Sequence, residues 1–157
     1  MFPDGRPPTI QEEREARPTS LYPESVETAL SEAAAMILGI GTDLLDVARM
    51  AAELAKEGGG FRDDVFTPAE IAYCEAKHRP ARHFAARFAA KEALFKALEG
   101  RAPAGFLDVE IAREGGAPRL VLRGAVKETA DRLGVRSVHV SLSHSDDLAT
   151  ASVVLEG

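Results

Sequence analysis

Residues 82–98, RHFAARFAAKEALFKAL, constrain the fold more than any other stretch of the sequence. They contain no glycine, proline or β-branched residue, and their content of Ala, Leu, Phe, Lys and Glu predicts an α-helix. In helical projection, one sector collects the large apolar side chains and the opposite side carries only alanines. The large side chains are Phe84, Phe88, Leu94, Phe95 and Leu98. Such a helix belongs in the interior of a domain, and its alanine side leaves room for another backbone.

Four charged residues interrupt this apolar pattern. Arg87 and Lys91 fall within the aromatic sector, and Glu92 and Lys96 lie on its flank. One interpretation is a solvated face, on which Glu92 and Lys96, four residues apart, form a favourable pair. Because buried charges are costly unless something pairs with them, we favour a second interpretation. In it, three cations and one carboxylate converge on an anionic ligand, with phosphate as the natural candidate and a metal ion beside it.

The overall composition limits the classes of protein to consider. A length of 157 residues suffices for one domain with a proper core. The net charge of −6 argues against nonspecific binding to nucleic acid or to an anionic membrane. No stretch approaches the roughly 20 apolar residues of a membrane span, and no signal peptide opens the chain, so we expect a cytoplasmic protein. The single cysteine, Cys74, is interpreted as a small core residue rather than a nucleophile.

The first 35 residues differ from the rest of the chain. They hold five of the nine prolines, and seven acidic residues against three arginines. This composition predicts a disordered N-terminal extension over residues 1–35 and a folded domain over residues 36–157.

The domain begins with MILGIGTDLLDV (36–47), which predicts a strand followed by a helix over roughly 44–56. Glycines at 39 and 41 within a strand indicate the close approach of another backbone or of a ligand. Asp43 falls at the expected strand–helix junction. There it is either the cap of the helix or a metal ligand, and Glu92 is the partner carboxylate that the second interpretation requires.

The remaining segments complete an α+β pattern. Thr67-Pro68-Ala69-Glu70 predicts a capping box that opens a helix, and the basic turn KHRPARH (77–83) is either a solvated loop or the rim of an anion pocket. Residues 108–124 and 135–156 each predict a β-hairpin, with a helix over 124–134 between them. His144, at a strand end, is either a core histidine or a ligand-binding residue. We expect an antiparallel sheet packed on the central buried helix, with sheet edges that favour oligomers.

Four stretches of the chain, taken in order, resemble the holo-acyl-carrier-protein synthases, the group-I 4′-phosphopantetheinyl transferases. They are GIGTDLLDVARM (39–50), FTPAEI (66–71), ARFAAKEALFKAL (86–98) and VHVSLSHSDDLATASVVLE (138–156). The resemblance implies the 4′-phosphopantetheinyl transferase fold and transfer of phosphopantetheine from coenzyme A to a serine of apo-acyl carrier protein. It also implies Mg²⁺ dependence, release of adenosine 3′,5′-bisphosphate, a place in fatty-acid or polyketide biosynthesis, and homotrimers with sites at subunit interfaces. A coenzyme A-binding module of a larger synthase that has lost transfer activity is the alternative.

The resemblance also assigns roles to residues. Asp43 and Glu92 match the metal ligands, and Lys96 matches both a catalytic and a phosphate-binding position. Arg87, Lys91 and the basic turn with Arg79 match further coenzyme-binding positions, and Ser143 and His144 match a segment that meets the coenzyme of a neighbouring subunit. The base that deprotonates the carrier serine is either Glu92 or a metal-bound water. The helix that meets the carrier is basic in the family, whereas here Glu53 and Glu57 follow Arg49.

Overall fold

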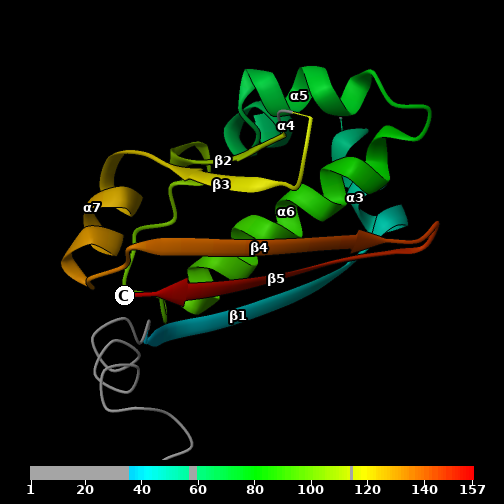
Figure 1. Cartoon of the computed structure of the whole chain (residues 1–157). Coiled ribbons are helices and arrows are strands. Elements are labelled where there is room, and N and C mark those ends of the chain that lie inside the picture. Colours follow the sequence, from blue (N-terminus) through cyan, green and yellow to red (C-terminus); the bar gives the residue numbers. More distant parts are fainter. Residues whose placement is uncertain (1–35, 57–59, 114) are drawn as a thin grey trace, which may run out of the picture. The chain divides into compact units, whose positions relative to one another are not determined.

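The structure, a computed structural model, describes residues 36–56, 60–113 and 115–157. The expectation of disorder in residues 1–35 therefore concerns residues outside the described ranges. The elements are, in order, β1 (Ile37–Asp46), α3 (Val47–Leu54), α4 (Gly60–Val65), α5 (Pro68–Glu75), α6 (Pro80–Ala97), η1 (Phe106–Asp108), β2 (Val109–Ala112), β3 (Arg119–Leu122), α7 (Gly124–Arg132), β4 (Ser137–His144) and β5 (Leu148–Glu156) (Figure 1). Their mixture of helices and antiparallel strands confirms the α+β prediction.

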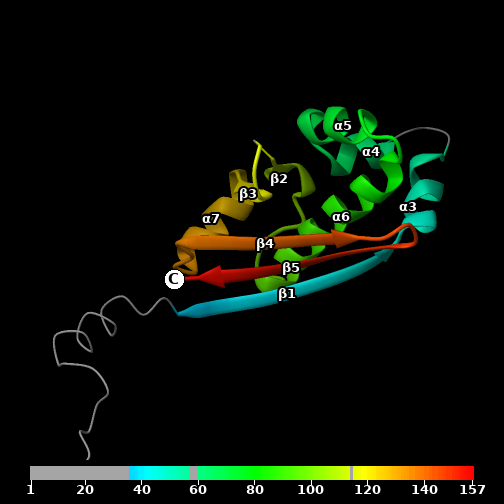
Figure 2. The same cartoon turned by 45° about the vertical axis from the view of Figure 1, so that its right-hand side comes forward.

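Two antiparallel sheets form the described domain. β1, β5 and β4 make a three-stranded sheet in that order, and β2 pairs with β3 as a separate hairpin. The long helix α6 lies along the three-stranded sheet (Figures 1 and 2). Inward side chains of β5 pack on α6 in one core cluster, which includes Ala151, Val153 and Leu155 from β5 and Ala93, Leu94 and Ala97 from α6. The prediction of an antiparallel sheet on a central buried helix is confirmed.

The alanine side of α6 receives the backbone of β1. A Cβ atom placed on Gly39 would lie 2.1 Å from the carbonyl oxygen of Ala97, and one placed on Gly41 would lie 1.9 Å from that of Ala93. Real Cβ atoms essentially never approach backbone oxygen so closely, so β1 lies at this distance from α6 only because both positions are glycine. The expected close approach of another backbone is confirmed, and the backbone in question is that of α6.

The junction between β1 and α3 differs from the prediction. β1 continues to Asp46, because its pairing with β5 runs without a break from Asp43 opposite Ala151 to Asp46 opposite Leu148. Asp46 is the N-cap of α3, and its Oδ1 accepts a hydrogen bond of 2.8 Å from the amide of Arg49. The predicted helix start at residue 44 was therefore wrong. The alternative of Asp43 as a helix cap was wrong as well, since Asp43 lies inside a strand.

Most other elements follow the predictions. α5 opens with the expected capping box, in which both reciprocal bonds between Thr67 and Glu70 are present. The hairpins β2–β3 and β4–β5 and the helix α7 also form where they were expected. The short helix α4, which begins at Gly60, was not predicted.

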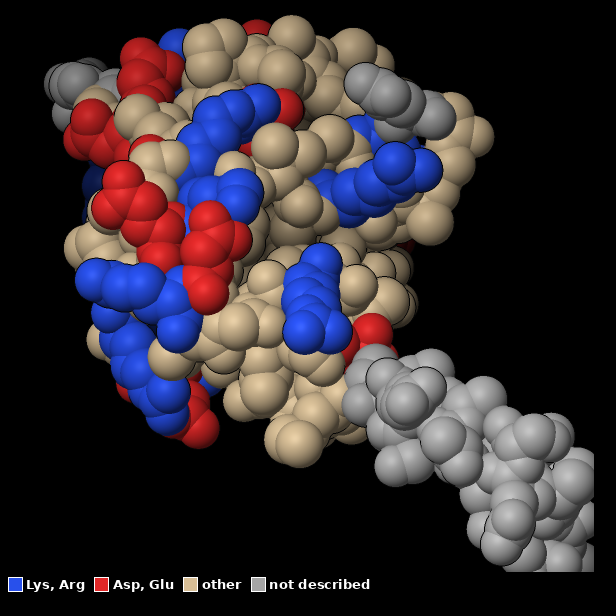
Figure 3. Space-filling view, turned by 60° about the vertical axis from the view of Figure 1, so that its left-hand side comes forward, with Lys and Arg blue, Asp and Glu red and all other residues tan. Residues whose placement is uncertain are grey.

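Two further observations concern the surface and the length of the helices. On the left of the face shown in Figure 3, basic and acidic side chains lie side by side, whereas the charged side chains farther right are mainly basic. Among the residues that the structure describes, no helix combines the length and apolar character needed to cross a membrane.

Candidate active site

Three of the predicted site residues meet at one place. Lys96 on α6 donates a hydrogen bond of 2.8 Å from Nζ to Oδ1 of Asp43 on β1, and a second one of 3.1 Å to the carbonyl oxygen of Thr42. Asp43 and Glu92 both line a cavity of about 420 Å³. The other residues that line it are Leu44, Leu45, Arg49, Met50, Glu53, Phe61 and Phe88. The close packing of β1 on α6 thus brings together two carboxylates and one ammonium that lie about fifty residues apart in the sequence.

Lys96 pairs directly with Asp43 but not with Glu92 among the described residues. Burial raises the pKa of Glu92, the nearby negative charge of Asp43 raises it further, and Lys96 offsets only part of the effect. The hydrogen bond to Asp43 raises the pKa of Lys96, so this lysine stays charged. Within the described part of the chain, Asp43 therefore has a direct cationic partner and Glu92 has none. Such a site favours a further cation.

The two carboxylates can be compared with the donor sets of divalent metal ions. Within the described ranges, no group of three or more His, Cys, Asp or Glu side chains could hold a metal ion by itself. Mg²⁺, however, commonly binds through one or two carboxylates and fills its other positions with substrate phosphate oxygens and water. Asp43 and Glu92 fit that donor set.

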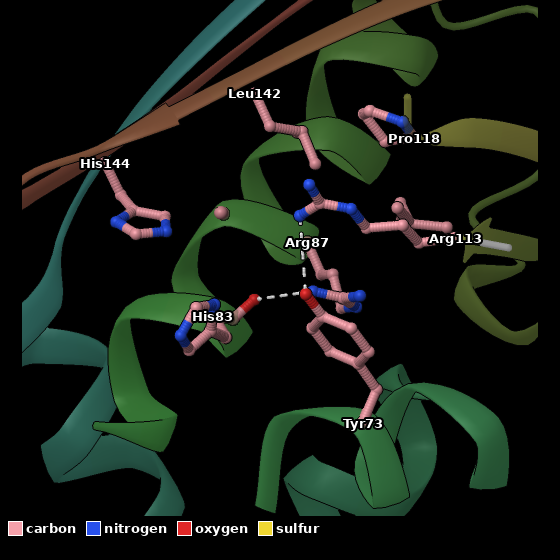
Figure 4. Close-up of a pocket in the computed structure, with 9 residues that line it drawn as sticks. Tyr73, His83, Arg87, Arg113, Pro118, Leu142 and His144 are labelled. Carbon is pink, nitrogen blue, oxygen red and sulfur yellow. Dashed lines mark hydrogen bonds between the residues drawn. The ribbon is translucent and has the colours of Figure 1, made fainter. Parts of the chain in front are cut away.

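A second cavity, of about 140 Å³, contains Arg87 and His144 (Figure 4). The Arg87 guanidinium lies 4.0 Å from the centre of the Tyr73 ring, and its Nη1 donates to the carbonyl oxygen of His83 at 3.5 Å. Its Nε is buried and has no hydrogen-bond partner among the described residues. Arg113 lines the same cavity and donates to the Tyr73 hydroxyl at 3.5 Å. Several cationic or protonatable groups therefore converge here, as an anion-binding site requires.

His144 reaches this cavity within its own chain. Its ring centre lies 4.9 Å from that of His83 in an edge-to-face arrangement, and its side chain is exposed, so the alternative of a core histidine was wrong. Ser143 precedes it on β4 and, because side chains alternate along a strand, points to the opposite face of the sheet. Ser143 does not line the cavity.

The structure corrects the role of Lys91. Its side chain is fully buried, and its Nζ lies 2.7 Å from Oε2 of Glu70, which is fully buried as well. The same Nζ donates to the carbonyl oxygens of Val65 at 2.7 Å and Phe106 at 2.9 Å. All three N–H groups of the ammonium are thus used inside the protein. A phosphate contact from Lys91, as the resemblance implied, is wrong for this arrangement.

Arg79 lies at the surface, in the turn before α6. Its Nη1 is 2.5 Å from Oδ1 of Asp146 in the β4–β5 turn, and Nη1 of Arg82 is 3.4 Å from the same oxygen. More than half of the side-chain surface of Arg79 and of Asp146 is exposed. An exposed pair of this kind is weak and open to competition by a phosphate.

Of the residues that line the second cavity, His83 lies in the basic turn that was one candidate for the rim of an anion pocket. Sequence reasoning missed Tyr73 and Arg113, which come from α5 and the segment after β2. No motif links them, since only the fold brings these elements together.

For Cys74 the sequence interpretation is confirmed: the residue is fully buried in the core, and burial raises the pKa of its thiol to about 11.

His83 gives the protein an acid-sensitive group. Burial lowers its pKa from 6.5 to about 4, with His144, Arg82, Arg87 and Lys77 adding to the effect. Between these two values the unfolded chain binds a proton that the folded chain does not, so stability decreases as the pH falls through this range. We expect His83→Phe, which keeps a ring but does not titrate, to lose less stability than the wild type between about pH 7 and about pH 4.5 in urea unfolding. Equal losses in both proteins would contradict this expectation.

Comparisons with known proteins agree with this geometry. A model of the 4′-phosphopantetheinyl transferase superfamily matches residues 39–151, which are well over half of the chain, so the chain belongs to this superfamily. Similar relatives are holo-[acyl-carrier-protein] synthases. One from Anaeromyxobacter dehalogenans is 48% identical over 125 residues, covering 78% of this chain and 98% of the relative. One from Koribacter versatilis is 44% identical over 124 residues, covering 77% of this chain and 99% of the relative.

Solved structures of the same kind share the fold. The holo-[acyl-carrier-protein] synthase of Neisseria meningitidis matches with a TM-score of 0.70 at 32% identity, over 78% of this chain and 100% of that one. The Helicobacter pylori synthase, solved in complex with coenzyme A, matches with a TM-score of 0.64 at 32% identity. The match covers 74% of this chain and 98% of that one. Both the predicted family and the predicted fold class are confirmed.

Proposed function

We propose that this chain transfers the 4′-phosphopantetheine group of coenzyme A to a serine of an apo-acyl carrier protein, with Mg²⁺ and in the cytoplasm. The observation that carries the proposal is the meeting of Asp43 and Glu92 at one cavity, with Lys96 bonded to Asp43. The proposal includes a place in fatty-acid or polyketide biosynthesis, because the similar relatives are holo-[acyl-carrier-protein] synthases.

In this proposal, Asp43 and Glu92 hold the metal. When bound, Mg²⁺ supplies charge neutralisation at the pyrophosphate of coenzyme A, which phosphoryl transfer needs more than covalent help. Lys96, with about half of its side chain exposed, is accessible to the leaving group and stabilises the charge that develops on it. Glu92 is also a candidate to accept the proton of the carrier serine, because its carboxylate lines the cavity at which the metal and the coenzyme would meet.

We assign the second cavity to the 3′-phosphate at the adenosine end of the coenzyme. Arg87 with its unpaired Nε and His144 would bind it, and Arg79 would leave Asp146 to join them. Both cavities take side chains from α6, Glu92 to one and Arg87 to the other.

We further propose a homotrimer with sites at the subunit interfaces, in which Ser143 and His144 also meet the coenzyme of a neighbour. β1 is an edge strand of its sheet, and it exposes Ile37, Ile40 and Leu44, each with more than half of its surface open. An edge strand with a row of exposed apolar side chains favours cover by another copy.

Intact-protein mass spectrometry tests the reaction directly. An apo-acyl carrier protein incubated with this protein, coenzyme A and Mg²⁺ is expected to gain the mass of one phosphopantetheinyl group, and EDTA is expected to prevent the gain. Coenzyme A binding without any transfer to several carriers would instead support a module that has lost its activity. Absence of both binding and transfer would overturn the proposal.

A further inference from the structure

Lys91 and Glu70 form a buried ion pair that the proposed chemistry does not use. Beyond its 2.7 Å contact with Lys91, Glu70 accepts hydrogen bonds from the amides of Thr67 at 2.9 Å and Ile111 at 3.0 Å. The pair thus has every polar atom satisfied. A buried pair of this kind rarely stabilises a fold more than apolar side chains of similar size would. Its presence next to Glu92 on α6 therefore calls for an explanation other than stability.

The carbonyl partners of Lys91 belong to two segments that carry aromatic side chains. Val65 is the last residue of α4, which also contains Phe61, and Phe106 is the first residue of η1. The ring of Phe106 stacks on that of Phe88, with centres 5.6 Å apart and planes at 21°. Phe88 in turn lies 6.0 Å from Phe61. One ammonium group thus holds both segments against α6, and Phe61, Phe88 and Phe106 form an aromatic row.

This aromatic row borders the cavity of the two carboxylates. Phe61 and Phe88 line it together with Leu45 and Met50, while Asp43 and Glu92 supply its charged side. Coenzyme A has the matching character, since its phosphates are anionic and its pantetheine arm is long and uncharged. An apolar surface beside the metal-binding carboxylates suits the arm at the point where it joins the pyrophosphate.

We infer that Lys91, held by Glu70, is a positioning residue that fixes the aromatic row at the distance from Asp43 and Glu92 that the pantetheine arm requires. The inference rests on the proposed function. It separates the two ends of the coenzyme, because the arm would contact the aromatic row whereas the 3′-phosphate of the adenosine end would bind at Arg87 and His144.

Calorimetric binding of two probes tests this role in the double variant Lys91→Met/Glu70→Gln. The double change leaves no unpaired buried charge, and Glu70→Gln keeps a side-chain oxygen that accepts the hydrogen bond from the amide of Ile111. The probes are coenzyme A and adenosine 3′,5′-bisphosphate, which lacks the arm, each with Mg²⁺. Lys127→Met, which removes an exposed lysine paired with Asp131, is the matched control.

We expect the double variant to bind coenzyme A roughly tenfold or more weakly, because small displacements at a binding surface are costly. Binding of adenosine 3′,5′-bisphosphate should stay at the wild-type level, as should both ligands in the control. Equal weakening of the two probes, or no weakening of either, would overturn the inference and leave the proposed function standing. Failure of the wild type to bind either probe would overturn the proposed function as well.

Discussion

Replacing either Asp43 or Glu92 by alanine is expected to abolish Mg²⁺-dependent transfer. Each change removes one of the two carboxylates that line the larger cavity, and a single carboxylate holds Mg²⁺ far less well. We expect the rate to fall by at least about 100-fold, as it does when a preorganised electrostatic group is removed from an active site. The measurement is the rate of carrier modification as a function of Mg²⁺ concentration.

Both variants should keep their fold. The side chains of Asp43 and Lys96 are 16% and 52% exposed, so their ion pair contributes at most about 1 kcal/mol. Burial disfavours the charged form of Glu92 in the folded protein, and its removal therefore has no large cost at neutral pH. Unfolding in urea should show stabilities close to that of the wild type.

Glu53 supplies the matched control for these two variants. Its carboxylate lines the same cavity, but it pairs with Lys56 at 2.6 Å and has no proposed part in metal binding. Glu53→Ala should retain the Mg²⁺ response. Wild-type turnover in Asp43→Ala or Glu92→Ala would contradict the assignment of the metal ligands. An equal loss of transfer rate in Glu53→Ala would show that the loss is not specific to the two proposed ligands.

The central helix was predictable because its sequence contains two local patterns at once. Large apolar side chains on one side and alanines on the other predict burial on both sides, and α6 is buried in this way. The glycines of β1 indicated a close approach, and the alanine side indicated where a backbone could fit. The glycines of β1 and the alanines of α6 form the two sides of one contact, although nothing in the sequence indicates that these two segments pack against each other.

The length of β1 could not be predicted in the same way. Leu44 and Leu45 fit both a helix and a strand, and the outcome depends on β5, which lies about a hundred residues away and pairs with β1 as far as Asp46. For that reason Asp43, and not Asp46, was the residue considered as a possible cap. Tertiary pairing overrode local propensity at this place.

The environment of Lys91 illustrates a similar limit for the candidate site. The sequence predicted that a lysine on a buried helix must have a partner, but Glu70 also satisfied a capping box, so it offered no sign of a second role. Lys91 and Glu92 are neighbours in the sequence and lie in different surroundings, one in the core and one at a cavity. The packing of α5, η1 and β2 around α6 buries Lys91 in the core and leaves Glu92 at the cavity, and this packing cannot be derived from the local sequence.

The largest effect on stability is expected for Gly41→Ala. The added Cβ would lie 1.9 Å from the carbonyl oxygen of Ala93 and 2.7 Å from the amide nitrogen of Ala97, both of which are backbone atoms that cannot rotate away. β1 and α6 would have to separate. We expect a loss of at least about 3 kcal/mol, the upper end for overpacking, out of a typical total of about 5–15 kcal/mol. Urea unfolding followed by circular dichroism measures it.

Two further variants identify the cause of this loss. In Gly116→Ala the added Cβ meets no atom within 4 Å, so this glycine in the β2–β3 turn should tolerate alanine with little change. Adding Ala93→Gly to Gly41→Ala should not restore stability, because the clash is with the backbone oxygen of residue 93 and not with its methyl group. Restoration would show that side-chain crowding, and not backbone contact, holds β1 in place. Since Asp43 follows Gly41 by two residues on the same strand, any Gly41→Ala protein that still folds should also need more Mg²⁺ for transfer, and this links the stability of the β1–α6 contact to the geometry of the site.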